Sequence, residues 1–115
     1  WNKRRREIAT DYSRRIQNPK IQTPEIPGED HVAHLYVVEC ENRNAFQSHL
    51  GRNGIASGIH YPIPDHRQPS MQGRPFFADG LRVTENLADR VVTLPCFPEM
   101  TDEEVSSVID SVNDW

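Results

Sequence analysis

The stretch TENLADRVVTLPCFPEMTDEEVSSVIDSV, residues 84–112, contains the clearest structural signals in the chain. Its second half predicts an amphipathic helix, because apolar residues recur at the spacing of one helical face: Val105, Val108, Ile109 and Val112. Thr101 and Glu104 form a capping box at the start of this helix, and Met100 and Val105 are placed for a hydrophobic staple. The sequence therefore predicts a capped helix that begins at residue 101.

The residues before this helix predict a helix followed by a strand. Thr84 can cap a helix that runs through Leu87 and Ala88, and the β-forming run 91–94 predicts a strand that ends at Pro95. Earlier in the chain, strands are predicted at 31–39 and 55–61, and a short amphipathic helix at 42–53. This alternation predicts an α/β (α+β) fold in two layers, a small domain with a roughly three-stranded sheet and helices mainly on one face.

The N-terminal segment predicts another helix, because Ile8, Tyr12 and Ile16 form an apolar stripe on a charged background. We expect this stripe to rest on a domain that precedes Trp1, with too little cover from the chain itself. The predicted division is a connecting helix at 1–18 and a small α/β domain at 19–115. Prolines predict an extended linker over 19–30, and residues 63–83 are predicted to be a long loop.

Composition excludes several classes of protein. With 115 residues and 36% hydrophobic content there is room for one small core, and the net charge of −4 with dispersed basic residues disfavours a nucleic-acid groove. No apolar run could span a bilayer and no signal-peptide pattern begins the chain, so we expect a cytoplasmic protein without membrane association. Cys40 and Cys96 lie among apolar residues and are predicted to be buried free thiols.

The loop sequence GIASGIHYPIPDHRQ, residues 54–68, is the candidate ligand site. It places polar side chains beside two prolines, which restrict the backbone, and groups fixed in this way need little ordering when a ligand binds. A metal site that combines His60 and His66 with His31 or His34 is disfavoured, because the spacing fits no zinc motif. The sequence also has no Gly-x-Ser-x-Gly elbow and no glycine-rich phosphate loop.

Taken together, these motifs resemble the DegT/DnrJ/StrS family of pyridoxal-phosphate (PLP) sugar aminotransferases. The matching elements are Gly54-Ile55, His60 to Pro62, His66 with Gln68, Thr84-Glu85, Leu94 to Pro98 and Thr101 to Glu104. The front helix, with Arg6, Ile8, Ala9 and Tyr12, resembles the long helix that joins the two domains of family members. The resemblance implies that the chain is the C-terminal small domain of a fold-type I aminotransferase.

The resemblance also implies a reaction and a set of contacts. The full-length enzyme would transfer an amino group from glutamate, through PLP, to the keto group of a nucleotide-linked sugar, and would act as a homodimer. His60 and Tyr61 would contact substrate, with His66 and Gln68 as weaker substrate-binding candidates and Arg67 in the same loop. The His66-x-Gln68 element favours amination at C3 of the sugar.

The resemblance places the catalytic groups outside this chain. PLP needs a Schiff-base lysine, an acidic partner and a phosphate site, and in the family all three belong to the large domain. Lys3 and Lys20 are the only lysines here, and both have surface contexts. We therefore expect no catalytic, cofactor-binding or metal-binding residue in the chain, and no activity from it alone. Two alternatives stay open: a non-catalytic regulatory or ligand-sensing relative, and an unrelated small α/β interaction module.

Overall fold

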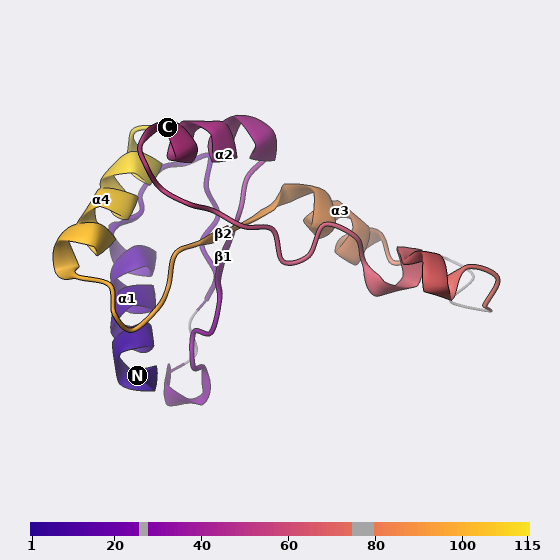
Figure 1. Ribbon diagram of the computed structural model, residues 1–115, viewed down its shortest axis with the longest axis horizontal. Coiled ribbons are helices and arrows are strands. Elements are labelled where there is room, and N and C mark those ends of the chain that lie inside the picture. The colour runs from indigo at the N-terminus through magenta and orange to yellow at the C-terminus, as the bar shows by residue number, and fades with distance from the viewer. Residues whose placement is uncertain (26–27, 75–79) are drawn as a thin grey trace.

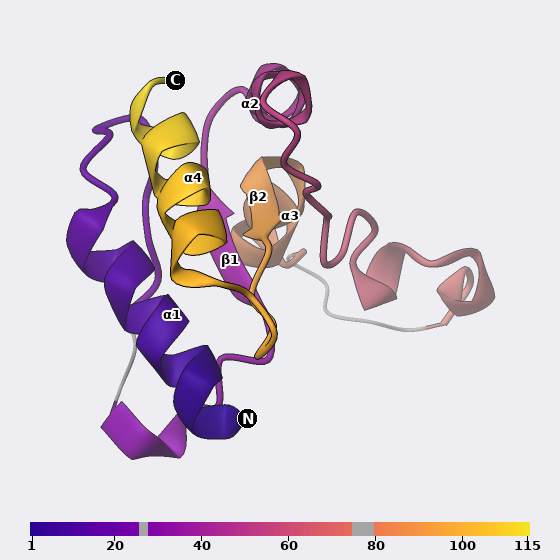
Figure 2. The same ribbon diagram turned by 60° about the vertical axis from the view of Figure 1, so that its left-hand side comes forward.

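The computed structural model describes residues 1–25, 28–74 and 80–115. The helices and strands in chain order are α1 (Asn2–Arg15), β1 (Tyr36–Glu39), α2 (Arg43–Arg52), α3 (Arg82–Arg90), β2 (Val91–Leu94) and α4 (Asp102–Asn113). Short 3-10 helices in the described residues are η1 (Gly28–Asp30), η2 (Asp65–Arg67) and η3 (Pro69–Met71). In Figures 1 and 2, α1 and α4 lie side by side next to the two strands, while α3 and the segment before it extend away from them. We call residues 60–74 together with α3 the arm.

The sheet has fewer strands than predicted. β1 and β2 pair antiparallel, with Tyr36 opposite Leu94, and they are the two strands of the only sheet among the described residues. The prediction of a three-stranded sheet is therefore wrong: the segment 55–61 adds a single bridge, between Gly58 and Thr93. Glycine weakens a strand and proline cannot donate to a ladder, so a segment with Gly58 inside it and Pro62 at its end pairs only locally.

Two predicted elements begin later or earlier than expected. The strand predicted at 31–39 is confined to β1, because the chain turns at Ala33, which has φ 50° and whose N–H donates to His31 Nδ1 (3.1 Å). Helix α3 begins at Arg82 and not at Thr84, with Leu81 at the N-cap position. The loop predicted at 63–83 contains η2 and η3, and its residues 75–79 lie outside the described residues, as do 26–27 of the predicted linker.

Helices α2 and α4 follow the prediction. In α2, Asn42 Oδ1 accepts from the N–H of Ala45 (3.3 Å), which satisfies one of the free donors of the first turn. In α4, the capping box forms in both directions: Thr101 Oγ1 accepts from Glu104 N (3.2 Å), and Glu104 Oε2 accepts from Thr101 N (2.9 Å). The capped start fixes the apolar face of α4 toward the core.

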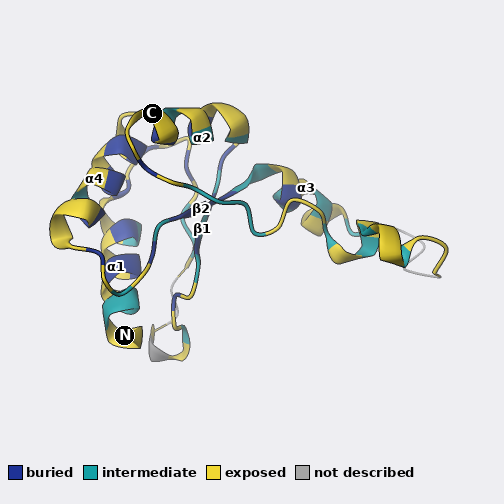
Figure 3. Ribbon diagram, viewed as in Figure 1, coloured by how far each residue is buried: buried dark blue, intermediate teal, exposed yellow. Residues whose placement is uncertain are grey.

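The core lies between the strands and the three helices α1, α2 and α4. Its fully buried large side chains include Tyr12, Tyr36, Phe46, Leu50, Val92, Ile109 and Val112. Figure 3 shows that buried residues gather in this part of the molecule, whereas the arm is mostly exposed or half-buried. The arm is joined to the core through β2, and Arg43 and the Cys40 N–H also donate to the carbonyls of Ala88 and Arg90 at the end of α3.

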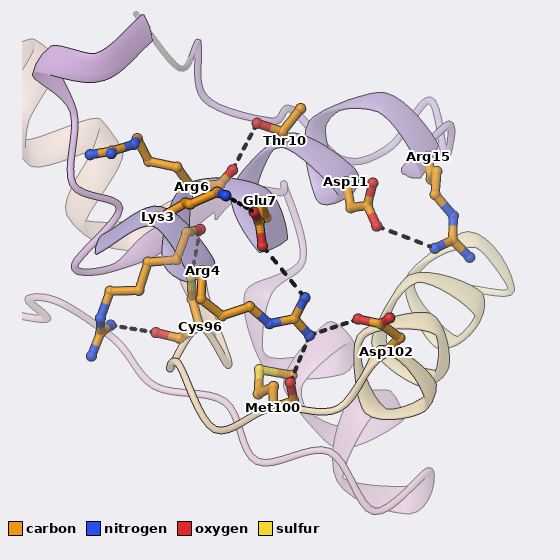
Figure 4. Close-up of polar contacts among 11 residues, drawn as sticks. Lys3, Arg4, Arg6, Glu7, Thr10, Asp11, Arg15, Cys96, Met100 and Asp102 are labelled. Atoms are coloured by element: carbon orange, nitrogen blue, oxygen red, sulfur yellow. Dashed lines mark hydrogen bonds and ion pairs between the residues drawn. The ribbon is translucent and has the colours of Figure 1, made fainter. Parts of the chain in front are cut away.

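Helix α1 packs on its own chain, contrary to the expectation that its stripe would lack cover. Ile8 and Tyr12 are 1% and 0% exposed, and Tyr12 donates through its hydroxyl to the Pro95 carbonyl (2.8 Å). Arg4 Nη2 donates to the Met100 carbonyl and to Asp102 Oδ1, both at 2.7 Å (Figure 4). Because α4 and the loop before it supply these partners, α1 contributes buried side chains to the same hydrophobic core as α4.

Cys40 and Cys96 are both buried free thiols, as predicted. Burial raises the pKa of each thiol, although Arg43 and Arg90 oppose the effect at Cys40 and Arg5 opposes it at Cys96. Since the thiolate is the reactive form, both side chains behave as small hydrophobic groups. Among the helices of the described residues, none is long and apolar enough to cross a membrane.

Candidate substrate-binding site

An open groove of about 690 Å³ runs along the arm. One wall is formed by side chains between His60 and His66, together with Met71. The other wall comes from α3 and its flanks, and is largely apolar: Leu81, Leu87, Ala88 and Val91. We call this feature the arm groove. Its combination of apolar walls with a few polar groups is typical of small-molecule sites.

His60 is held at one end of the groove by strand β2. Its Nδ1 lies 2.8 Å from Oγ1 of Thr93, and Thr93 is only 6% exposed. The backbones of Gly58 and Thr93 exchange two hydrogen bonds, at 3.0 and 2.8 Å, so the loop and the strand are fixed together at the same place. Because Nδ1 is engaged by Thr93, Nε2 is the nitrogen with which the imidazole can meet a ligand.

Gly58 makes room for the His60 ring. A Cβ placed on Gly58 would lie 3.0 Å from His60 Cε1, which is tighter than ordinary contacts between such atoms. The absence of a side chain therefore allows the imidazole to lie against the bridged pair. Glycine therefore fits this position because the His60 ring approaches its backbone closely, and not because the backbone needs a conformation that only glycine adopts.

Tyr61 projects from the loop next to His60. Its side chain is 70% exposed, and the two rings meet edge to face with centroids 5.2 Å apart. The peptide bond between the two residues is cis. The phenol can donate or accept a hydrogen bond, and the neighbouring imidazole offers Nε2, so together they present two polar groups at the groove.

Glu85 on α3 connects the loop to the opposite wall. Its Oε1 lies 2.9 Å from Nε2 of His66 and accepts from Nε of Arg67 (3.1 Å), while Oε2 lies 2.9 Å from Arg67 Nη2. The hydrogen bond with His66 is the main reason that the pKa of Glu85 is lowered; burial opposes this effect, and the charge of Arg67 adds to it. The carboxylate is therefore stabilised in its charged form by η2.

The predicted site residues fall into two groups. His60, Tyr61 and His66 line the arm groove, as one site would require. Gln68 instead donates through Nε2 to the Ile63 carbonyl (3.1 Å), across the base of the loop. Gln68 and Arg67 thus have partners within the arm, which is compatible with support of the loop as well as with ligand contact.

Sequence analysis missed three residues that shape this site: Gly58, Thr93 and Glu85. Glu85 was part of a recognised motif but received no role, and its spacing from His66 gave no sign of contact. Thr93 was counted only as a strand residue, although a hydroxyl in a buried strand needs a hydrogen-bond partner. That requirement was the one signal in the sequence that could have indicated a polar contact at Thr93.

The residues of the chain do not fit a covalent attachment of PLP. Lys3 Nζ lies 3.9 Å from Glu7 on an exposed face of α1, and Lys20 donates to the Trp115 carbonyl (2.8 Å). Neither lysine lines the arm groove. Within the described residues, no three His, Cys, Asp or Glu side chains are grouped so that they could hold a metal ion. What the groove offers is a binding surface made of apolar groups, an imidazole and a phenol.

Comparison with known proteins gives this surface a context. The chain is 41% identical over 113 residues to a dTDP-3-amino-3,6-dideoxy-alpha-D-galactopyranose transaminase of Aneurinibacillus thermoaerophilus, covering 97% of the chain. It is 37% identical over 111 residues, 95% of the chain, to the erythromycin biosynthesis sensory transduction protein EryC1 of Saccharopolyspora erythraea. The chain spans 31% and 30%, respectively, of the lengths of these relatives.

Solved structures show the same arrangement. The structure of DesV from S. venezuelae, in complex with a ketimine intermediate, matches with a TM-score of 0.92 and 34% identity, over 100% of this chain and 32% of that one. NtdA from Bacillus subtilis, solved with bound PMP, matches with a TM-score of 0.81 and 29% identity, over 96% of this chain and 27% of that one. Residues 1–113 match the model of the DegT/DnrJ/EryC1/StrS aminotransferase family, and the chain belongs to that family.

Proposed function

We propose that this chain is the C-terminal portion of a PLP-dependent enzyme that transfers an amino group from glutamate to a keto-sugar nucleotide. Residues 1–18 would be the connecting helix and 19–115 the small domain, with PLP bound by a preceding large domain in a cytoplasmic homodimer. Family membership supports this proposal, as does the coverage of about 31% of a sugar transaminase by nearly the whole chain. PMP in the NtdA structure supports the cofactor. The match to the family removes the alternative of an unrelated interaction module.

The observation that carries the proposal is the fixed imidazole of His60 at the end of the arm groove. A side chain held by a buried partner loses little further freedom when it binds a ligand, so its hydrogen bond to a sugar hydroxyl or a carboxylate costs little entropy. Tyr61 would provide the second polar contact. The apolar wall of α3 would exclude water from the bound sugar, and His66 and Gln68 would complete the substrate-binding loop.

PLP, when bound, supplies the electron sink that makes movement of the amino group possible. The residues of this chain would contribute binding and orientation. His60 and Tyr61 would fix the sugar so that its keto carbon faces the cofactor domain, because transfer requires the reacting atoms to approach closely. No proton transfer is assigned to this chain.

We propose C3 as the carbon that is aminated. The His66-x-Gln68 element favours this position, and the name of the transaminase from Aneurinibacillus thermoaerophilus refers to a 3-amino sugar. A 3-keto substrate should therefore be preferred over a 4-keto isomer.

The test is an assay of the full-length protein with PLP, glutamate and a dTDP-linked 3-keto-6-deoxyhexose. We expect formation of the amino sugar, detected by mass spectrometry, and conversion of the PLP absorbance to that of PMP with glutamate alone. The 4-keto isomer is the control for position. Binding of the sugar nucleotide without any amino transfer would contradict the enzyme proposal and favour the regulatory alternative, which the name of the EryC1 relative suggests.

A further inference from the structure

We propose that Glu85 is a positioning residue for the substrate loop, which we define as residues 60–68. It would act through His66 and Arg67: the contacts of these two side chains with the Glu85 carboxylate on α3 would hold the loop in place. The consequence for catalysis rests on the proposed function, whereas the consequence for loop structure does not.

The contacts converge on one carboxylate. His66 lies 2.9 Å from Oε1, and Arg67 reaches both oxygens, through Nε at 3.1 Å and Nη2 at 2.9 Å. A single exposed ion pair contributes little to stability, but a bidentate guanidinium combined with an imidazole fixes the geometry of all three groups. Glu85 and His66 are half-buried, with side chains 25% and 16% exposed.

Glu85 connects two different elements of the arm. Glu85 lies in the first turn of α3, and His66 and Arg67 belong to η2, so the network joins the two walls of the arm groove. Inside η2, the N–H of Arg67 donates to the Pro64 carbonyl (2.9 Å). These bonds make a compact turn. Among the described residues, its only side-chain hydrogen bonds and ion pairs to α3 involve the Glu85 carboxylate.

The substrate loop is therefore fixed at both ends. Thr93 holds His60 at the start, and Glu85 holds His66 and Arg67 near the end. Tyr61 lies between these two points and is 70% exposed. Since little else packs around Tyr61, its placement at the groove depends on both attachments, and the loss of Glu85 should loosen it.

Amide hydrogen exchange of the full-length holoenzyme tests the structural part. In Glu85→Ala, we expect peptides that cover residues 60–68 to exchange about tenfold faster, with β2 and α4 unchanged. His66→Ala keeps the pair between Arg67 and Glu85 and should give a smaller increase. The double variant should exchange no faster than Glu85→Ala alone, because Glu85→Ala already removes the bonds to both His66 and Arg67. Asp89→Ala, an exposed carboxylate on the same helix, is the matched control and should leave the loop unchanged.

Kinetics of the same variants test the catalytic part. Glu85→Ala should raise KM for the sugar nucleotide about tenfold with little change in the glutamate half-reaction or in the PLP absorbance, and Glu85→Gln should restore part of the loss. If Glu85→Ala unfolds, amide exchange of the loop in Glu85→Gln is the test, and we expect it to be faster than in the wild type. Unchanged loop exchange, or additive effects of Glu85→Ala and His66→Ala, would overturn the inference. If the enzyme proposal itself fails, no sugar is aminated, yet the exchange result still stands by itself.

Discussion

Nδ1 of His60 lies 2.8 Å from the hydroxyl oxygen of Thr93, 33 positions later in the chain. This contact joins the substrate loop to Thr93 of β2, the same residue whose backbone forms the bridge with Gly58. It explains how a side chain on an irregular segment can have a defined orientation. A buried hydroxyl and a functional imidazole satisfy each other, so fold and site share one interaction.

Thr93→Val should damage the site more than the fold. Valine has nearly the same shape but leaves Nδ1 of His60 without its partner, so we expect a loss of about 1–2 kcal/mol in the free energy of unfolding. In the full-length enzyme, kcat/KM for the sugar should fall about tenfold. Urea denaturation and steady-state kinetics measure the two effects. Thr93→Ser keeps the hydroxyl and is the control. Equal activity of the valine and serine variants would argue against a role for this contact.

Gly58→Ala should displace the His60 ring. The new Cβ would lie 3.0 Å from Cε1, so the imidazole must shift by a few tenths of an ångström and lose alignment with Thr93. We expect a reduced kcat/KM for the sugar with the fold retained, measured by kinetics and circular dichroism. Gly51→Ala is the control: no atom lies within 4 Å of its Cβ position, and in α2 it should stabilise by about 0.5–1 kcal/mol. Identical activity of both variants would show that Gly58 has no spatial role.

Acid should release the loop from α3. The pKa of Glu85 is lowered in the folded protein, mainly by its hydrogen bond with His66, so its contribution to stability is present at pH values above the pKa of an unfolded glutamate, about 4.3. As the pH falls below that value and through the lowered pKa, protonation removes the contribution. Loop exchange, corrected for intrinsic pH dependence, should therefore rise in this acidic window. In Glu85→Gln this acidic rise in loop exchange should be absent. If the rise persists in that variant, a group other than Glu85 causes it.

Tyr12→Phe tests whether α1 belongs to the core of this domain. The hydroxyl donates to the Pro95 carbonyl from a fully buried ring, and burial is the main reason that the pKa of Tyr12 is raised. Its removal should cost about 1 kcal/mol of unfolding free energy. Tyr61→Phe is the matched control. Because Tyr61 is 70% exposed, removal of its hydroxyl should affect activity but not stability. No change in Tyr12→Phe would show that the hydrogen bond to Pro95 adds nothing to the packing of α1.

Local signals in the sequence predicted the helices well and the sheet less well. The capping box of Thr101 and Glu104 is confirmed, because capping depends on residues only a few positions apart. The cover over Tyr12 was missed because its partner Pro95 is distant in the chain, and periodicity shows that a face is buried but not what buries it. The prediction of a third strand was wrong: composition indicated a strand at 55–61, but this segment forms a single bridge, at Gly58.

The candidate site shows the same limit. Clustering of polar residues around Pro62 and Pro64 predicted a site that contains His60, Tyr61 and His66, and these three residues do line one groove. Their partners Thr93 and Glu85 were not predicted, since each is distant in sequence and neither belongs to the loop. The sequence thus indicated three residues that line the groove, whereas the residues that hold them could be identified only from the fold.

The central claim is that His60 contacts the sugar substrate while another part of the enzyme holds the cofactor. Its most direct test is single-turnover amination of the 3-keto-sugar nucleotide by the full-length His60→Ala enzyme, with the PLP absorbance recorded in the same sample. We predict an unchanged cofactor spectrum and a sugar amination rate, at subsaturating sugar, that is lower by about tenfold or more. Loss of the PLP absorbance, or amination at the wild-type rate, would contradict the claim.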